Sequence, residues 1–206
     1  MKEVPLGILG SGKGTNCRAI LESIRSGFLA AEVRVVISDV FDARILDIAR
    51  EFSVPNAYLP PGKFHTRLEP QAEIELVGML RDAGVELVVL AGFMRVLKSP
   101  MLDAFPRRIL NIHPSLLPKF PGLEAWKQAL VTGELVTGCT VHYVDEKIDH
   151  GDVIAQREVP ILPNDTPESL HARIQILEHE LYPAVIADFC KRYNEASQQN
   201  GGWPDK

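Results

Sequence analysis

The sequence predicts an α/β protein built on a doubly wound, mostly parallel sheet, with an antiparallel strand pair in its C-terminal half. From Val4 to His113, short β-branched runs alternate with helical patterns, as is typical of βαβ units around a parallel sheet. The run from Leu87 to Ala91 is apolar throughout, as expected of a strand that helices cover on both faces. After Gly122, two strand patterns are separated only by a polar loop, which predicts the antiparallel pair.

The first half of the chain supplies most of the parallel part. The apolar run that begins at Val4 leads into a glycine-rich loop, and the helical pattern after it places Ala19, Ile20 and Ile24 on one face. A Pro-Pro-Gly sequence at 60–62 ends a short third strand. We expect strands at 4–9, 33–37, 57–59 and 87–91, with further helices at 45–52 and 72–83.

The second half completes the sheet and ends in a long helix. We expect a short helix at 99–105, a strand at 109–113, the antiparallel pair at 140–144 and 153–159, and a helix from Pro167 to Tyr193. Residues 194–206 are polar and glycine-rich, which predicts a mobile tail. Since no repeat or low-complexity linker divides the chain, we predict one domain over residues 1–193.

Composition restricts the classes of partner. The 206 residues include 22 Lys and Arg against 27 Asp and Glu, a formal charge of −5, whereas binding to a nucleic-acid backbone usually needs a basic face. No apolar run approaches the ~20 residues of a membrane span, and the N-terminus lacks the apolar stretch of a signal peptide. The widely spaced Cys17, Cys139 and Cys190 predict reduced thiols. We therefore expect a cytoplasmic protein that binds neither nucleic acid nor membranes.

The first candidate site is the glycine-rich loop from Gly10 to Asn16. At such a strand-to-helix turn, backbone N–H groups and the helix dipole can hold an anion. The loop has Walker A spacing but carries Gly14 where Ser or Thr should bind magnesium, and Thr15 replaces the third glycine of the dinucleotide fingerprint. A tight turn that requires positive φ would also account for the glycines. We favour a phosphate site closed by Thr15 and Asn16.

The second candidate site is the end of the strand at 109–113. Asn111 and His113 point to one face because strand side chains alternate, and Pro114 and Pro118 then force the chain out of the sheet. Ligands of open α/β sheets bind at this edge, and an amide donor beside an imidazole suits a carbonyl oxygen that gains charge during acyl transfer. Either side chain would also serve to cap a turn, but their pairing at a strand end favours a functional role.

The polar loop before the last strand carries a third candidate, Asp149. It precedes His150 and Gly151, and we expect the glycine to permit an unusual backbone that turns the carboxylate inward. A carboxylate near His113 would raise the pKa of the imidazole above its usual value of about 6.5 and keep the cation near neutral pH. His150 and Asp152 are too few ligands for a metal site, so no metal is expected.

Several motifs occur in a characteristic order along the chain. They are Gly12-Lys13-Gly14-Thr15-Asn16, Ala91-Gly92-Phe93-Met94-Arg95-Val96-Leu97, Asn111-x-His113-Pro114-Ser115-Leu116-Leu117-Pro118, Pro121-Gly122-Leu123, Gly138-x-Thr140-Val141-His142, Asp149-x-Gly151 and Glu178-His179-x-x-Tyr182-Pro183. Through them the chain resembles the phosphoribosylglycinamide formyltransferase (glycinamide ribonucleotide transformylase) family over residues 4–190. Several spaced motifs in order are more specific than any single one.

The resemblance implies a formyltransferase-type Rossmann-like fold and a defined reaction. The formyl group of 10-formyltetrahydrofolate, a co-substrate, would pass by direct attack to the amine of 5-phosphoribosylglycinamide, a step of de novo purine (IMP) biosynthesis. Small molecules would be the substrates, no metal would take part, and the enzyme would be a monomer or homodimer.

The resemblance also implies roles for individual residues. The catalytic trio that stabilises a tetrahedral oxyanion would be Asn111, His113 and Asp149. The ribonucleotide would be bound by Gly14, Thr15, Asn16, Gln175 and Glu178. The folate would be bound by Arg67, Met94, Arg95, Val96, Leu97 and Asn111. The guanidinium of Arg95 would pair with the folate glutamate carboxylate.

Four positions depart from the family pattern, and two of them, His150 and Asp152, lie in a turn that often carries Gly or Pro in the family. Lys13 replaces a more usual small or polar residue in the glycine loop and would add affinity for phosphate. Glu124 stands where the family often has His, so we assign the loop around Gly122 no catalytic role.

Four other functions are alternatives. Formyltetrahydrofolate deformylase has a similar core after an N-terminal regulatory domain, whereas Met1 here leads directly into the first strand. Methionyl-tRNA formyltransferase adds an RNA-binding domain and a basic surface, whereas this chain is acidic and its ordered pattern ends near 193. A phosphate-sensing binding module would have no need of Asn111, His113 and Asp149. A dehydrogenase with Asp39 on the ribose would need the third glycine of its fingerprint.

Overall fold

The computed structural model describes residues 2–200, with backbone only for 198–200. The strands are β1 (Val4–Leu9), β2 (Ala31–Ser38), β3 (Asn56–Tyr58), β4 (Leu87–Leu90), β5 (Ile109–His113), β6 (Val136–Tyr143) and β7 (Val153–Pro160). The helices are α1 (Thr15–Arg25), α2 (Arg44–Glu51), α3 (Pro70–Asp82), α4 (Ser99–Ala104), α5 (Ala125–Val131) and α6 (Pro167–Asn200). Among the described residues, no helix is both long and apolar enough to cross a membrane.

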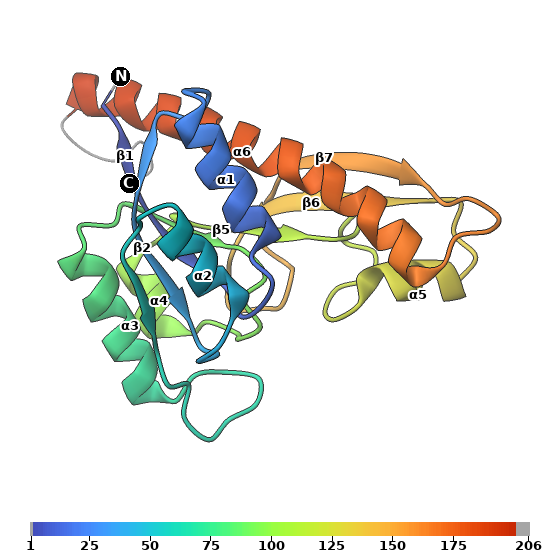
Figure 1. The fold of residues 1–206 in the computed structure, drawn as a ribbon, viewed down its shortest axis with the longest axis horizontal. Coiled ribbons are helices and arrows are strands. Elements are labelled where there is room, and N and C mark those ends of the chain that lie inside the picture. Colours follow the sequence, from blue (N-terminus) through green and yellow to red (C-terminus); the bar gives the residue numbers. More distant parts are fainter. Residues whose placement is uncertain (1, 201–206) are drawn as a thin grey trace.

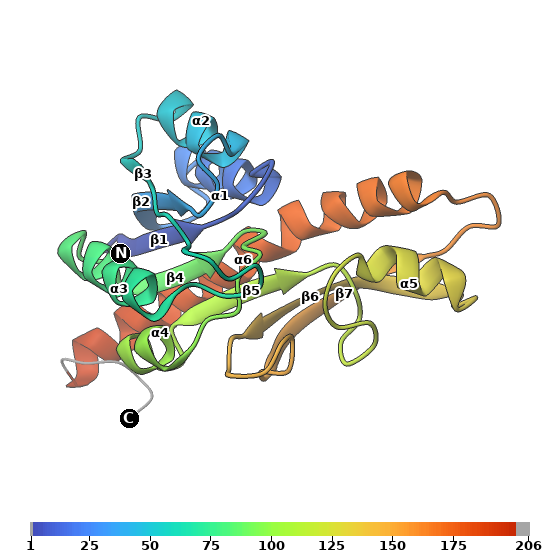
Figure 2. The ribbon, with the colours of Figure 1, turned by 90° about the horizontal axis from the view of Figure 1, so that it is seen from below.

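One seven-stranded sheet runs through the protein in the order β3-β2-β1-β4-β5-β6-β7 (Figures 1 and 2). The strands from β3 to β5 pair in parallel, whereas β6 pairs antiparallel with both β5 and β7. The order reverses between β1 and β4, and in open α/β sheets ligands bind outside the carboxyl ends of the strands at such a point. The predicted fold class is confirmed, including the antiparallel pair in the C-terminal half.

Helices cover both faces of the parallel part. Residues of α1, α2 and α6 enclose one hydrophobic core with the sheet, and residues of α3 and α4 enclose a second core on the opposite face. Along β4, Leu87 and Val89 point into the first core, while Val88 and Leu90 point into the second. The uninterrupted apolar run predicts this burial on both faces correctly.

Two helices differ from the prediction. Helix α5 is absent from it, because only Ala125 and Ala129 of its seven residues are buried and no apolar stripe marks it. Helix α6 continues beyond the predicted end at Tyr193 to Asn200. Asn194, predicted to begin the mobile tail, is buried, and its amide donates hydrogen bonds to the carbonyls of Lys2 and Cys190 at 2.9 and 3.0 Å. Residues 201–206 of that tail lie outside the described residues.

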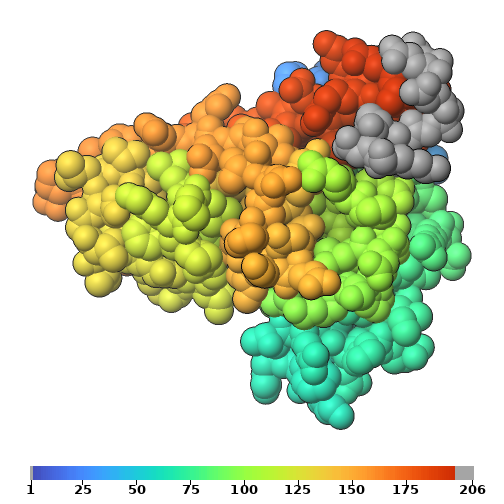
Figure 3. All heavy atoms as spheres, turned by 180° about the vertical axis from the view of Figure 1, so that it is seen from behind, coloured from blue at the N-terminus to red at the C-terminus, as the bar shows by residue number. Residues whose placement is uncertain are grey.

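The loops at the carboxyl edge of the sheet lie next to one another. The loop after β1 bonds to the segment after β4 through the Ser11 N–H and the Gly92 carbonyl at 3.0 Å. The loop between β6 and β7 lies on the surface between the segments that follow β4 and β5 (orange in Figure 3). It contacts both flanks, since Lys98 Nζ donates to the Glu146 carbonyl at 3.5 Å and the Gly122 N–H donates to Asp149. These loops carry the candidate residues.

Candidate active site

Strand β5 places Asn111 and His113 at the carboxyl edge of the sheet. Both side chains reach Asp149: Asn111 Nδ2 donates to Asp149 Oδ1 at 3.4 Å, and His113 Nδ1 lies 3.3 Å from Asp149 Oδ2. His113 is only 4% exposed. The structure thus brings together three residues that are separated by up to 38 positions in the sequence.

The backbone turns the Asp149 carboxylate inward, by a route that differs from the prediction. Asp149 itself has a φ of +50°, which is uncommon for a residue other than glycine. Gly151 permits a close approach instead, because a Cβ there would lie 1.9 Å from the carbonyl oxygen of Tyr143. The Gly122 N–H donates to Asp149 Oδ2 at 2.8 Å, so the loop around Gly122, to which we assigned no catalytic role, holds this carboxylate.

The pKa of His113 shifts in the direction opposite to the prediction. Burial lowers this pKa, and the opposing effects of the Asp149 carboxylate and the Phe120 carbonyl do not compensate for it. The Nε2–H of His113 donates to that carbonyl at 2.8 Å, which leaves Nδ1 as the basic position facing Asp149. Burial acts to raise the pKa of Asp149, but contacts with His142, His113 and the Gly122 N–H lower it overall. Near neutral pH the pair is therefore a neutral imidazole beside a carboxylate.

His142 is a site residue that the sequence reasoning missed. It lies opposite Asn111 in the β5–β6 pair and is 2% exposed. Its Nδ1–H donates to the Tyr143 carbonyl at 2.7 Å, so Nε2 can accept the Asn111 Nδ2–H at 3.1 Å. The same Nε2 is 3.6 Å from Asp149 Oδ1. The alternation of side chains predicts that His142 shares a strand face with Thr140. Only the pairing register with β5 shows that His142 lies beside Asn111.

A direct pH titration tests the electrostatics of this site. We expect the imidazole of His113 to titrate below 6.5, as followed by NMR of histidine-labelled protein. In Asp149→Asn the pKa should fall further, because the carboxylate acts to raise it by favouring the imidazolium. A His113 pKa above 6.5, or no fall in the variant, would contradict this assignment.

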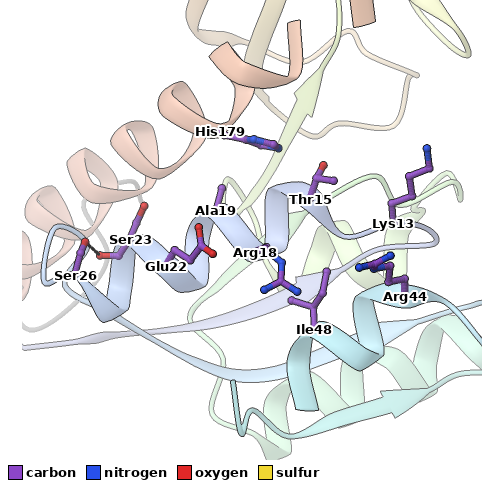
Figure 4. A pocket seen from close by; sticks show the side chains of 10 residues that line it. All are labelled: Lys13, Thr15, Arg18, Ala19, Glu22, Ser23, Ser26, Arg44, Ile48 and His179. Atoms are coloured by element: carbon purple, nitrogen blue, oxygen red, sulfur yellow. Dashed lines mark hydrogen bonds between the residues drawn. The ribbon is translucent and has the colours of Figure 1, made fainter. Parts of the chain in front are cut away.

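The glycine-rich loop forms the entrance to a pocket at the start of α1. Gly14 precedes the helix with a φ of +72°, and a Cβ there would lie 2.8 Å from Ile45 Cα. The first turn of α1 carries no acidic residue, which leaves its positive end unopposed. The pocket, of about 680 Å³, has Lys13, Thr15 and Arg44 at this end (Figure 4). It is well suited to an anion.

Residues of α6 close the other side of the glycine loop. Asn16 Nδ2 donates to Glu178 Oε2 at 3.0 Å, and both residues are buried. Burial raises the pKa of Glu178, against the effect of the Asn16 hydrogen bond. Gln175 lies one helical turn before Glu178. Among the described residues, Asn16 Oδ1 and His179 Nε2 are buried without a hydrogen-bond partner, so a ligand has polar atoms to satisfy here.

The segment after β4 holds four of the six residues predicted for the folate, and Arg67 lies beside it. Arg67 and Val96 form a parallel bridge, and Met94 is 54% exposed. The side chain of Leu97 is buried in the second core, so only its backbone can face a ligand. The predicted pairing of Arg95 with a folate carboxylate does not fit, because its Nε donates to Asp39 Oδ2 at 2.6 Å inside the protein.

The three cysteines are not reactive groups of the site. Burial raises the pKa values of Cys17, Cys139 and Cys190 to about 12, so all three free thiols are protonated and unreactive at neutral pH. Within the part of the chain that the structure describes, no three His, Cys, Asp or Glu side chains gather as metal ligands would.

Comparison with known proteins assigns the family. The model of the formyl transferase family matches residues 6–186. The chain belongs to this family. Among solved structures, the glycinamide ribonucleotide transformylase 1 of Symbiobacterium toebii is 47% identical, with a TM-score of 0.88 and coverage of 93% of this chain and 89% of that one.

Two curated relatives of this formyl transferase differ in length. Phosphoribosylglycinamide formyltransferase of Haemophilus influenzae is 39% identical over 89% of this chain and 86% of its own. The trifunctional purine biosynthetic protein adenosine-3 of Drosophila pseudoobscura pseudoobscura is 44% identical over 87% of this chain. The chain spans only 13% of the length of that trifunctional protein.

Proposed function

We propose that this formyl transferase moves the formyl group of 10-formyltetrahydrofolate to the amine of 5-phosphoribosylglycinamide in de novo purine biosynthesis. The observation that carries the proposal is the meeting of Asn111, His113 and Asp149 at the sheet edge that also carries the glycine loop and the 94–97 segment. Its substrates are small molecules, it needs no metal, and it works in the cytoplasm as a monomer or homodimer.

The two substrates have complementary places at this edge. The unopposed N-terminus of α1, with Gly14, Thr15 and Asn16, takes the phosphate of the ribonucleotide, and Lys13 adds a positive charge. Asn16 Oδ1, with Glu178 beside it and Gln175 one turn earlier on α6, accepts a ribose hydroxyl. The folate lies along Arg67 and the segment from Met94 to Leu97.

The reaction is a direct acyl transfer. The amine attacks the formyl carbon, a C–N bond forms, and the carbonyl π electrons move to oxygen. Asn111 Nδ2 gives up its long 3.4 Å hydrogen bond to Asp149 and donates to this oxyanion instead. Its hydrogen bond to His142 keeps the amide oriented. Nδ1 of His113 holds the proton released by the amine, and Asp149 balances the imidazolium charge. When the oxyanion collapses and the C–N10 bond breaks, that proton is returned to N10.

An absorbance assay of formyl folate consumption tests the proposed function. The purified protein is mixed with 10-formyltetrahydrofolate in the presence and absence of 5-phosphoribosylglycinamide. We expect consumption only when the ribonucleotide is present. Consumption in both reactions would indicate a deformylase, and consumption in neither would favour a phosphate-binding module.

Replacement of Asn111 by alanine tests the oxyanion contact. We expect kcat to fall by about 10²–10³-fold, as for loss of one oxyanion donor, with little change in melting temperature. The matched control is Asn56→Ala on the edge strand β3, where the side-chain amide donates to the nearby Val54 carbonyl at 3.2 Å. A kcat within about threefold of that control would exclude the oxyanion role, since the smallest loss expected is about 10²-fold.

A further inference from the structure

Asp39 is a buried carboxylate that the reaction does not use. It directly follows β2 and its side chain is only 1% exposed. Oδ1 accepts the Ser11 hydroxyl at 2.5 Å, and Oδ2 accepts the Arg95 Nε–H at 2.6 Å. A buried charge is retained only where such partners compensate for its lost hydration. In the structure this position holds an internal ion pair, which leaves the ribose-binding role of a dehydrogenase without support.

The partners of Asp39 come from different loops of the sheet edge. Ser11 belongs to the glycine loop after β1, and its Oγ also accepts the Met94 N–H at 2.8 Å. Arg95 follows β4, and its guanidinium donates to the carbonyls of Phe64, at 2.8 Å, and His65. One carboxylate therefore joins the ends of β1, β2 and β4 and the loop that precedes α3.

The network holds one side of the segment from Met94 to Leu97, which is called the folate segment below. Met94 donates its N–H to Ser11, the Val96 N–H donates to the Thr66 carbonyl at 2.9 Å, and the Lys98 N–H donates to Glu73 Oε1 at 2.5 Å. Among the described residues, no hydrogen bond occupies the backbone N–H groups of Arg95 and Leu97. They are placed to face a ligand only while the framework fixes the segment.

We infer that Asp39 is a positioning residue for the formyl folate: through Ser11 and Arg95 it fixes the Met94–Leu97 segment and so sets the affinity for this co-substrate without touching it. The inference rests on the proposed function, since it takes that segment as the folate side. The ribonucleotide contacts at Thr15 and Asn16 do not depend on Asp39, because α1 is packed against α6 in the first core. The two substrates should therefore respond differently to its loss.

The substitution Asp39→Asn tests this inference. Asparagine keeps the size and one acceptor oxygen, but its amide group sets a donor against either Arg95 or Ser11. We expect the KM for formyl folate to rise by about 10- to 100-fold, as for loss of a supporting contact or a displacement of about 1 Å. The KM for the ribonucleotide should stay within about twofold. The matched control is Asp47→Asn, an exposed carboxylate that pairs with Arg50 on α2.

Calorimetric titration with formyl folate alone separates the possible failures. If the parent protein does not bind formyl folate, the proposed function fails. If it binds and Asp39→Asn binds equally well, or if both KM values rise together, the positioning role is overturned. Should Asp39→Asn not fold, Ser11→Ala leaves the Asp39–Arg95 pair intact and removes the hydroxyl that connects Asp39 to the Met94 N–H. It should still weaken formyl folate binding by several-fold, and unchanged binding would overturn the inference.

Discussion

Replacement of His113 by alanine is expected to lower kcat by about 10²–10⁴-fold, the usual contribution of a general acid–base group. The imidazole is the only group in the proposed mechanism that both receives the amine proton and returns it to N10. Its Nδ1 faces Asp149 at 3.3 Å, and its Nε2–H is fixed by the Phe120 carbonyl at 2.8 Å. Alanine removes the proton carrier and leaves the glycine loop and the folate segment in place. Steady-state kinetics with both substrates saturating measure the effect.

The matched control for this variant is His150→Ala. His150 lies on the loop that carries Asp149 but is exposed and pairs with Asp145 at 3.1 Å. We expect this control to retain near-normal turnover. If His113→Ala also retained it, with ribonucleotide-dependent consumption of formyl folate, the assigned proton path would be wrong.

Replacement of Asp149 by asparagine is expected to have a comparable effect, about 10²–10⁴-fold in kcat, as for the carboxylate that orients a catalytic histidine in hydrolytic triads. An amide cannot balance the charge of the imidazolium that forms on His113. In the parent protein the Gly122 N–H and the Asn111 amide both donate to the carboxylate oxygens. The NH₂ group of asparagine would face one of these two donors and could not accept its hydrogen bond. The variant therefore loses the electrostatic support of the imidazolium and one of the two hydrogen bonds that the carboxylate accepts from these groups.

Kinetics and thermal melting distinguish this effect from simple unfolding. The control is Asp145→Asn on the same loop, whose carboxylate is exposed and accepts the Lys147 N–H at 2.8 Å. We expect Asp149→Asn to melt close to the control while its kcat is severely reduced. Equal kcat values for the two variants would remove Asp149 from the mechanism.

The sequence predicts the parts of the fold that periodicity encodes. The alternation of Leu87 and Val89 with Val88 and Leu90 between two cores follows from one apolar run. The placement of Asn111 and His113 at a strand end follows from the prolines after them. Helix α5 is not predicted by the sequence, because two buried alanines give no periodic signal. The last turns of α6 are not predicted either, because the amide of Asn194 is held by the backbone at the other end of the chain, at Lys2.

The electrostatics of the site are where sequence reasoning fails. It places Asp149 near His113 but gives the wrong direction for the His113 pKa, because burial depends on packing that no local pattern reveals. It misses His142, whose contact with Asn111 depends on the strand register. It also leaves Arg95 free for a ligand, whereas the buried Asp39, 56 positions away, takes its guanidinium.

Transfer of an isotopic label tests the central claim most directly. The protein is incubated with 10-formyltetrahydrofolate carrying ¹³C in the formyl group, together with 5-phosphoribosylglycinamide, and the products are followed by ¹³C NMR. The account predicts that the label appears as a formamide on the ribonucleotide amine. Label released as free formate, or retained on the folate, would contradict direct formyl transfer by this site.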